Sequence, residues 1–305
     1  MRSQVGPLIR LLRPQQWLKN GFVLVGLLFG HAWHDPARVT QAMLAFAAFC
    51  LLASAVYVMN DLVDRPRDRR HPHKRRRPLA SGAVGVPAAL ALMAGCLAGG
   101  FALVLWSGSR APWLFLLYVA LNVAYTLRLK HVVILDVFII AAGFMLRILV
   151  GTLGIGIPPS QWLLLCGLML TLFLGFAKRR AELGAPGISG APGEEGGDDA
   201  SAHRRVLEHY SPALLDQLMT VATAGTIVSY SLYTVSAETV ALHGTTNLIY
   251  TVPLVIYGMF RYLYLLHRRG GGGDPTRQLL GDPHLLAALT GWLLLVLALL
   301  GQATS

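Results

Sequence analysis

The chain has 305 residues, of which 54% are hydrophobic and 13% are charged. Soluble domains usually carry about 25% charged residues, so this composition excludes an ordinary soluble protein. The net charge of +11 would suggest a nucleic-acid partner in a soluble protein, but here the basic residues gather in alternate loops, which the positive-inside rule explains without nucleic acid. Because the apolar runs are long and lack the alternation of barrel strands, we expect an all-α membrane protein in contact with membrane lipid.

Nine transmembrane helices are predicted from the apolar runs. In chain order they cover residues 15–33, 39–59, 86–106, 112–128, 132–154, 161–178, 213–234, 247–266 and 284–301. Most of the 26 Lys and Arg residues fall in the connections on one side of these helices. The positive-inside rule assigns that side and the N-terminus to the cytoplasm, and the C-terminus to the outside.

One segment differs in composition from the rest of the chain. Residues 184–202 are rich in Gly, Pro and acidic residues and carry almost no bulky apolar side chain, which predicts a flexible cytosolic loop. Predicted helices continue on both sides of this loop. We therefore expect a single integral-membrane domain over residues 1–305.

The second predicted helix ends in the sequence N-D-L-V-D-R-P-R-D, from Asn60 to Asp68. Its carboxylates, Asp61, Asp64 and Asp68, recur at spacings of three and four, which would place them on one face of a continuing helix. Alternatively, Pro66 ends that helix and leaves Asp68 on a turn that bends back. Such oxygen ligands suit Mg²⁺, which takes one or two carboxylates together with substrate phosphate oxygens. A solvated charge run at the membrane surface is the alternative. Against it, Asn60 and Asp61 directly follow an apolar run, where a carboxylate without a role is costly.

A basic cluster, H-P-H-K-R-R-R-P, follows at residues 71–78. By itself it could anchor the chain at the membrane or bind anionic lipid. Beside a metal-type motif it indicates phosphate binding, because Lys and Arg hold the polyphosphate oxygens that a metal leaves open. We expect Lys74 and at least one of Arg75, Arg76 and Arg77 to do so.

Three more polar clusters fall on the same predicted side of the membrane. They are Arg13–Asn20, which contains Lys19; Tyr125–His131, which contains Lys130; and Lys178–Glu182, which contains Arg179. Asp136 and Arg147 lie within an apolar run, either as a structural pair with partners on other helices or as functional residues, the default for intramembrane charges. Convergence of the clusters predicts a cytosolic-facing polar cavity.

These motifs resemble the UbiA superfamily of intramembrane transferases, which have nine helices and two Asp-rich cytosolic motifs. Asn60–Asp68 matches the first motif, N-D-x-x-D-x-x-x-D, in full. In the second motif Tyr125, Lys130 and Asp136 match, whereas Val132 stands where another acid would be expected. The resemblance implies a UbiA-like helical bundle.

Within the superfamily the chain is most similar to the decaprenyl-phosphate phosphoribosyltransferase branch. The similarity rests on R-P-x-Q-W-x-K-N at 13–20, H-P-x-K-x-x-R-P at 71–78, L-K-H…L-D at 129–136 and K-R-x-A-E at 178–182. It implies Mg-dependent transfer of 5-phosphoribose from 5-phosphoribosyl-1-diphosphate to a polyprenyl phosphate, with release of pyrophosphate. It further implies a bacterial-type inner (plasma) membrane location and a role in supplying lipid-linked pentose for the cell envelope.

The resemblance also implies roles for individual residues. Asp61, Asp64, Asp68 and Asp136 would be catalytic, and the metal and diphosphate would be held by Asn60, Asp61, Asp64 and Asp68. Substrate would be bound by Lys19, Asn60, Lys74, Arg77, Tyr125, Lys130, Arg147, Lys178, Arg179 and Glu182. Among these, Lys19, Arg147, Lys178 and Arg179 are candidates to hold the acceptor head group.

Two other functions stay open at this point. A prenyl transfer from a prenyl diphosphate to an aromatic acceptor would use the same fold, but it predicts a second complete pair of acids, which Val132 argues against. A non-catalytic lipid transporter would instead line a path through mid-membrane with polar residues and show inverted repeats. Assembly into a homo-oligomer is compatible with each of these functions.

Overall fold

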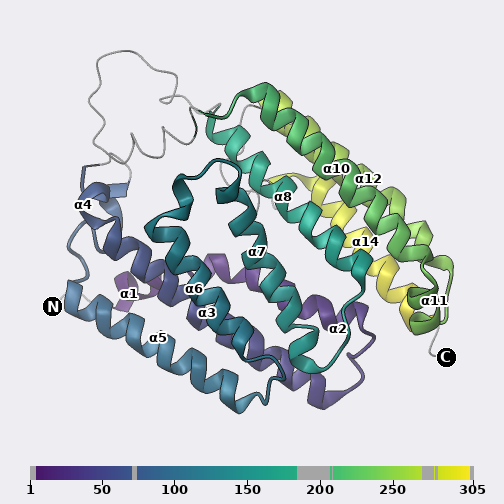
Figure 1. Ribbon diagram of the computed structural model, residues 1–305, viewed down its shortest axis with the longest axis horizontal. Helices are drawn as coiled ribbons and strands as arrows, with labels where there is room; N and C mark the ends of the chain where they lie inside the picture. The colour runs from purple at the N-terminus through teal and green to yellow at the C-terminus, as the bar shows by residue number, and fades with distance from the viewer. Residues whose placement is uncertain are drawn as a thin grey trace. The chain divides into compact units, whose positions relative to one another are not determined.

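The computed structural model describes residues 5–70, 74–183, 207, 209–269, 278 and 281–302. All regular elements within these residues are α-helices or short 3₁₀ helices, which confirms the all-α prediction (Figure 1). The chain forms two compact units. The described parts of unit 1 lie within Met1–Val132 and Leu146–Pro158, and those of unit 2 lie within Val133–Met145, Pro159–Glu194 and Arg204–Ser305.

Unit 1 is organised around the long helix α3. Its elements are α1 (Val5–Leu12), the 3₁₀ helix η1 (Pro14–Leu24), α2 (Val25–Phe29), α3 (Pro36–Val63), α4 (Arg65–Asp68), η2 (Lys74–Arg76), α5 (Val86–Trp106), α6 (Trp113–Leu127), η3 (Leu129–His131), the end of α7 (Leu135–Val150) and η4 (Leu153–Ile155). Asp35 caps α3 by accepting hydrogen bonds from the first free backbone N–H groups, and Pro36 occupies the position where a missing N–H costs nothing. Helices α3 and α5 run side by side (Figure 1).

The core of unit 1 combines apolar side chains with one close backbone approach. Phe49 on α3 packs against Phe115 and Tyr118 on α6, with ring centroids 4.8 and 5.1 Å apart. Where α2 meets the end of α7, a Cβ on Gly26 would collide with the carbonyl of Gly151. Glycine is therefore required at this crossing for steric reasons, not for backbone flexibility.

Unit 2 contains the start of α7 and the remaining helices. These are α8 (Gln161–Leu183), α10 (Pro212–Val235), α11 (Ala237–His243), η5 (Asn247–Thr251), α12 (Val252–Arg269) and α14 (Pro283–Gln302). Helices α8 and α10 lie side by side (Figure 1), and Phe173 of α8 meets Tyr262 of α12 edge to face. Asp282 caps α14 and also receives two hydrogen bonds from Arg261, so the α12–α14 connection is held by an ion pair.

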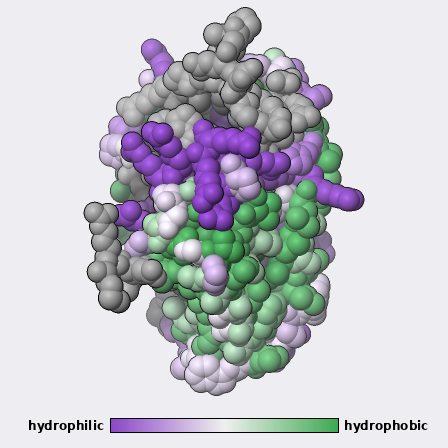
Figure 2. Space-filling model, turned by 90° about the vertical axis from the view of Figure 1, so that its left-hand side faces the viewer, coloured by the Kyte–Doolittle hydropathy of each residue, from purple (hydrophilic) through white to green (hydrophobic). Residues whose placement is uncertain are grey.

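The helices identify a multi-pass membrane protein. Within the described residues seven helices are long and apolar enough to cross a membrane, and Trp113–Leu127 is a shorter apolar helix. The face on the side of α4 and α5 carries a hydrophilic band above a hydrophobic surface (Figure 2). On α5 the side chains of Leu105 and Trp106 are among the most exposed apolar groups, which is typical of a surface that faces lipid.

The predicted count of nine transmembrane helices is not confirmed. The expected first span, residues 15–33, forms η1 and the five-residue α2 instead of one continuous helix. Arg13 takes a left-handed conformation before Pro14, and the polar residues after it pack along α3, so this stretch follows a 3₁₀ path. The single domain over residues 1–305 stays a prediction, and the expected loop 184–202 lies outside the described residues.

Candidate functional site

The first Asp-rich motif lies where α3 ends. The helix stops at Val63, and the four-residue helix α4 follows, with Pro66 in its first turn, where proline is tolerated. This break separates the three carboxylates by environment. Asp61 and Asp68 are each 3% exposed, whereas the side chain of Asp64 is 25% exposed. Of the two predicted arrangements, the structure has the helix that ends before Pro66, with two buried acids and one partly open acid in place of a single face of three.

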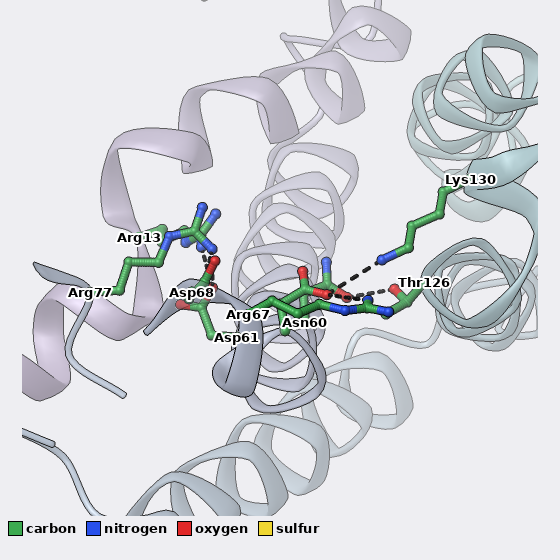
Figure 3. A network of polar contacts seen from close by, with 9 residues as sticks. Arg13, Asn60, Asp61, Arg67, Asp68, Arg77, Thr126 and Lys130 are labelled. Atoms are coloured by element: carbon green, nitrogen blue, oxygen red, sulfur yellow. Dashed lines mark hydrogen bonds and ion pairs between the residues drawn. The ribbon is translucent and has the colours of Figure 1, made fainter. Parts of the chain in front are cut away.

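Two arginines form ion pairs with the buried carboxylates (Figure 3). Arg77 Nη1 lies 2.7 Å from Asp68 Oδ2 and 3.2 Å from Asp61 Oδ1, and Arg13 Nη2 lies 2.5 Å from the same Asp61 oxygen. The Arg13 guanidinium also stacks over the ring of Tyr57, 5.1 Å from its centroid. These contacts join the N-terminal cluster, the Asp-rich motif and the basic cluster that follows it. We call Arg13, Asp61, Asp68 and Arg77 the arginine clamp.

The other half of the motif faces α6 and η3 (Figure 3). Lys130 Nζ lies 3.4 Å from Asp64 Oδ1, and Arg67 Nη1 lies 3.9 Å from the same oxygen. Asn60, one helical turn before Asp64, lies 2.5 Å from the hydroxyl of Thr126. The structure thus brings Lys130 of the second cluster to the first motif, as the convergence of clusters requires.

The donor chemistry of this half suits a magnesium ion. No group of three or more His, Cys, Asp or Glu side chains is arranged for a metal among the residues that the structure describes. Magnesium usually takes only one or two carboxylates and fills its remaining positions with water and phosphate oxygens. Asp64 is the least buried of the three acids, and the Asn60 amide is one turn away, so this pair fits the ion better than the clamped Asp61 and Asp68. The full predicted set of four metal ligands stays a prediction.

The other predicted phosphate ligands near this motif are spread over neighbouring elements. Lys74 begins η2 and is exposed, and Tyr125 lies partly buried in the last turn of α6. The arginines Arg67, Arg70, Arg75 and Arg76 are exposed as well. This end of α3 is therefore surrounded by positive charge, which attracts anionic ligands.

Side chains of the R-P-x-Q-W-x-K-N segment form successive hydrogen bonds with α3, which we call the rungs of a ladder. The indole N–H of Trp17 donates to Ser54 Oγ at 3.1 Å, and the Asn20 amide contacts Cys50 Sγ at 3.3 Å. Asn20 Oδ1 in turn accepts from Arg147 Nε at 2.8 Å. Lys19, one of the predicted acceptor ligands, is partly buried on η1 between these rungs.

Arg147 is enclosed inside unit 1. Besides Asn20, its guanidinium donates to the Tyr118 hydroxyl at 2.9 Å and stacks over the Tyr118 ring at 4.7 Å. Asp136 lies in unit 2, with other partners. Arg147 was expected to be either structural or functional, and these contacts favour a structural role as a link between η1, α6 and α7.

A second polar cluster lies in unit 2, around the start of α7. Asp136 is fully buried, and its two oxygens accept from Arg179 Nε and from the Tyr210 hydroxyl, both at 2.8 Å. Arg179 Nη1 also lies 2.7 Å from Glu182 Oε2. Lys178, by contrast, is 45% exposed and lies 3.9 Å from Glu182. We call Asp136, Arg179, Glu182 and Tyr210 the buried quartet.

Tyr210 also supports a strained backbone. Its hydroxyl accepts a hydrogen bond from the backbone N–H of Ile134 at 2.6 Å, and Ile134 has a positive φ of 69°, a genuine outlier for a β-branched residue. Burial, together with the hydrogen bond to Asp136, raises the pKa of Tyr210. The phenol therefore stays neutral and can donate to the carboxylate.

Sequence reasoning missed three residues of these networks. The motifs contain Arg13 and Thr126 only as members of clusters, without a role of their own, and Tyr210 lies in none of them. Thr126 follows Tyr125 in the second motif, so its position at the end of a predicted helix was an available signal. Tyr210 lies 74 residues after Asp136, and no local pattern connects the two.

Residues 21–280 match the model of the UbiA prenyltransferase family, and the chain belongs to this family. Over 290 residues it is 32% identical to the decaprenyl-phosphate phosphoribosyltransferase of Corynebacterium glutamicum, a match that covers 93% of this chain and 84% of the relative. It is also 32% identical to the enzyme of the same name from Mycolicibacterium smegmatis, with 96% of this chain and 92% of that protein covered.

A solved structure supports the fold assignment. The structure of a UbiA homolog from Archaeoglobus fulgidus bound to GPP and Mg²⁺ matches with a TM-score of 0.68, 19% sequence identity and 98% of each chain covered. At that identity the likeness establishes the fold alone. The predicted UbiA-like bundle is therefore confirmed, and the predicted cytosolic-facing cavity stays a prediction.

Proposed function

We propose that this protein transfers 5-phosphoribose from 5-phosphoribosyl-1-diphosphate to a polyprenyl phosphate and releases pyrophosphate. The observation that carries this proposal is the polar network at the end of α3, where Asn60 and Asp64 face Lys130 beside the arginine clamp. Relatives of that name, which align over more than nine-tenths of the chain, support the choice of substrates.

The reaction needs placement and charge neutralisation more than proton transfer. A phosphate oxygen of the acceptor attacks C1 of the ribose, the bond between C1 and the diphosphate oxygen breaks, and pyrophosphate leaves with the electron pair. Because the acceptor is already an anion, the step requires no general base on the protein, and alignment of the two substrates supplies much of the rate.

In this proposal the two halves of the first motif have different tasks. Asn60 and Asp64 would hold Mg²⁺, which would supply positive charge to neutralise the charge on the departing diphosphate. Lys130, Lys74 and Tyr125 bind diphosphate or ribose phosphate oxygens. The arginine clamp fixes the α3–α4 break, so that Asp61 and Asp68 act through the position of Arg77 and not as direct metal ligands.

The remaining predicted residues divide by burial. Lys19, on η1 in unit 1, is the candidate for the acceptor phosphate, and the same role for Lys178, the exposed cation of its cluster in unit 2, stays a prediction. Arg147 and Arg179 are buried among neutral or acidic partners and act as positioning residues. Asp136 and Glu182 hold Arg179.

The proposal includes the orientation of the chain. The exposed arginines around α4 and η2 follow the positive-inside rule, which assigns the end of α3 and the N-terminus to the cytoplasm and the C-terminus to the outside of a bacterial-type plasma membrane. The water-soluble donor would then arrive from the cytoplasm, and the polyprenyl tail would stay in the lipid.

A transfer assay on the purified full-length protein tests the proposal. Donor labelled in the ribose is incubated with polyprenyl phosphate and Mg²⁺, and label is measured in the organic phase. We expect transfer that stops on chelation, returns with Mg²⁺ and falls at least about 100-fold in Asp64→Asn, because a lost transition-state contact of this kind costs about 10²–10³ in rate.

The matched control is Glu238→Gln, which neutralises an exposed acid on α11. It should transfer label at the wild-type rate. If the wild type transfers no ribose but moves a prenyl group from a prenyl diphosphate to an aromatic acid, the proposal is wrong and the aromatic prenyltransferase is right.

A further inference from the structure

Thr126 occupies a buried position against the first motif, near the C-terminal end of α6. Its Oγ1 lies 2.5 Å from the side-chain oxygen position of Asn60 and 2.8 Å from the backbone carbonyl oxygen of Asn122. All three residues belong to unit 1. The hydroxyl therefore stands between two groups that both present an acceptor.

A hydroxyl has one proton and cannot donate to both acceptors. A helical threonine commonly donates to the carbonyl four residues earlier, which here is Asn122. The contact drawn between Thr126 Oγ1 and Asn60 Oδ1 then has no proton, and it becomes a hydrogen bond when the amide is turned so that its nitrogen donates and Thr126 accepts. The oxygen and nitrogen of an asparagine amide are distinguished by such partners, so the hydrogen-bond balance determines which way the amide faces.

We propose that Thr126 is a positioning residue that turns the amide oxygen of Asn60 toward a divalent cation beside Asp64. This inference rests on the proposed function, because it concerns the same metal. With Thr126 bound to the amide nitrogen, the oxygen points away from α6, on the helix that also carries Asp64 one turn later. The opposite arrangement would consume the oxygen and present an NH₂ group, which a cation avoids.

The two arrangements predict opposite effects of Thr126→Val, which removes the hydroxyl and keeps the shape. If Thr126 holds the amide oxygen toward the cation, the variant lets the amide rotate and weakens cation binding. Loss of an outer hydrogen-bond partner typically costs 10–100-fold in metal affinity, and we expect about 10-fold here. If Thr126 instead consumes the oxygen, the variant binds the cation as well as or better than the wild type.

The test is a Mn²⁺ titration of the purified full-length protein, with the free ion measured by electron paramagnetic resonance. Thr126→Ser keeps the hydroxyl and should restore binding. Thr171→Val is the matched control, because Thr171 is a buried threonine on α8 that donates to its own helix carbonyl. In the transfer assay, Thr126→Val should raise the Mg²⁺ concentration for half-maximal rate and leave the rate at saturating Mg²⁺ close to wild type.

A double substitution covers the case in which Thr126→Val is merely unstable. In an Asn60→Asp background either carboxylate oxygen can face the cation, so adding Thr126→Val should change Mn²⁺ affinity less than about twofold. Wild-type affinity in Thr126→Val, or a loss that Thr126→Ser does not restore, overturns the role of Thr126 and leaves the proposed function standing. A wild-type protein that binds no Mn²⁺ and transfers ribose without metal overturns both the metal site and this inference.

Discussion

The buried quartet allows a quantitative prediction about unit 2. Asp136→Asn keeps an oxygen that can accept from Tyr210, but it removes the charge and turns an NH₂ group toward the Arg179 Nε that now donates to the carboxylate. Removing one partner of a buried ion pair costs about 3–5 kcal/mol. At roughly 2–4 °C per kcal/mol, the melting temperature in detergent should fall by at least about 6 °C.

The matched control is Lys178→Gln, one residue before Arg179. Its ammonium group lies 3.9 Å from Glu182 and is 45% exposed, and exposed pairs are worth roughly 0–1 kcal/mol. We therefore expect a shift of about 4 °C or less. The double variant Asp136→Asn/Arg179→Gln should lose less than the two single variants together, by roughly 1–3 kcal/mol, because each single variant leaves one buried member of the Asp136–Arg179 pair without the other, whereas the double variant removes both.

Ion binding tests the same reasoning independently of stability. Both oxygens of Asp136 are already hydrogen-bonded within the quartet, so Asp136→Asn should leave Mn²⁺ affinity within about twofold of wild type. The reasoning is refuted if Asp136→Asn and Lys178→Gln have the same melting temperature, or if Asp136→Asn abolishes Mn²⁺ binding at a temperature where the protein is folded.

Three further predictions concern packing, the ladder and pH. Gly151→Ala should cost about 1–3 kcal/mol in thermal unfolding through a steric clash, whereas Gly95→Ala, in open space on α5, should be neutral or slightly stabilising; equal effects would contradict the close approach. Trp17→Phe should cost about 1 kcal/mol by removing the indole bond to Ser54, and a Ser54→Ala background should absorb part of that cost in a double-mutant cycle. The pKa of Tyr210 is raised above its unfolded value near 10, so its contribution to folding stability is complete below about pH 10 and is lost as the pH rises beyond that value. Tyr210→Phe should therefore be less stable than wild type near pH 8, and the difference in stability between the two should shrink toward pH 11.

The sequence predicts the long helices well, because an apolar run of about 20 residues has few alternatives in a bilayer. The prediction of 86–106 coincides with α5, and 213–234 differs from α10 by a residue at each end. The prediction of one continuous helix over residues 15–33 was wrong, and the reason is also physical. Their total hydrophobicity suits a helix, but Trp17 and Asn20 have partners on α3, and tertiary contacts decide between 3₁₀ and α geometry.

The sequence predicted which motifs belong to the candidate site, but not which of their residues contact one another. Spacing identified the acids from Asn60 to Asp68, and the charge of the next loop indicated an anion. Pro66 indicated where α3 could end, but spacing could not reveal that Arg77 returns to pair with Asp68. The second motif shows the same limit, because the hydroxyl that donates to Asp136 belongs to Tyr210, 74 residues further along the chain.

The spacing of the hydrogen bonds between η1 and α3 also constrains the length of η1. The rungs of this ladder advance by three residues on η1, from Trp17 to Asn20, and by four on α3, from Ser54 to Cys50. Three residues of a 3₁₀ helix rise about 6 Å and so do four residues of an α-helix, so the two repeats stay commensurate along the shared axis. A one-residue deletion inside η1 would therefore shift the later rung by roughly 2 Å, and the error would be felt at Arg147, the next link after Asn20.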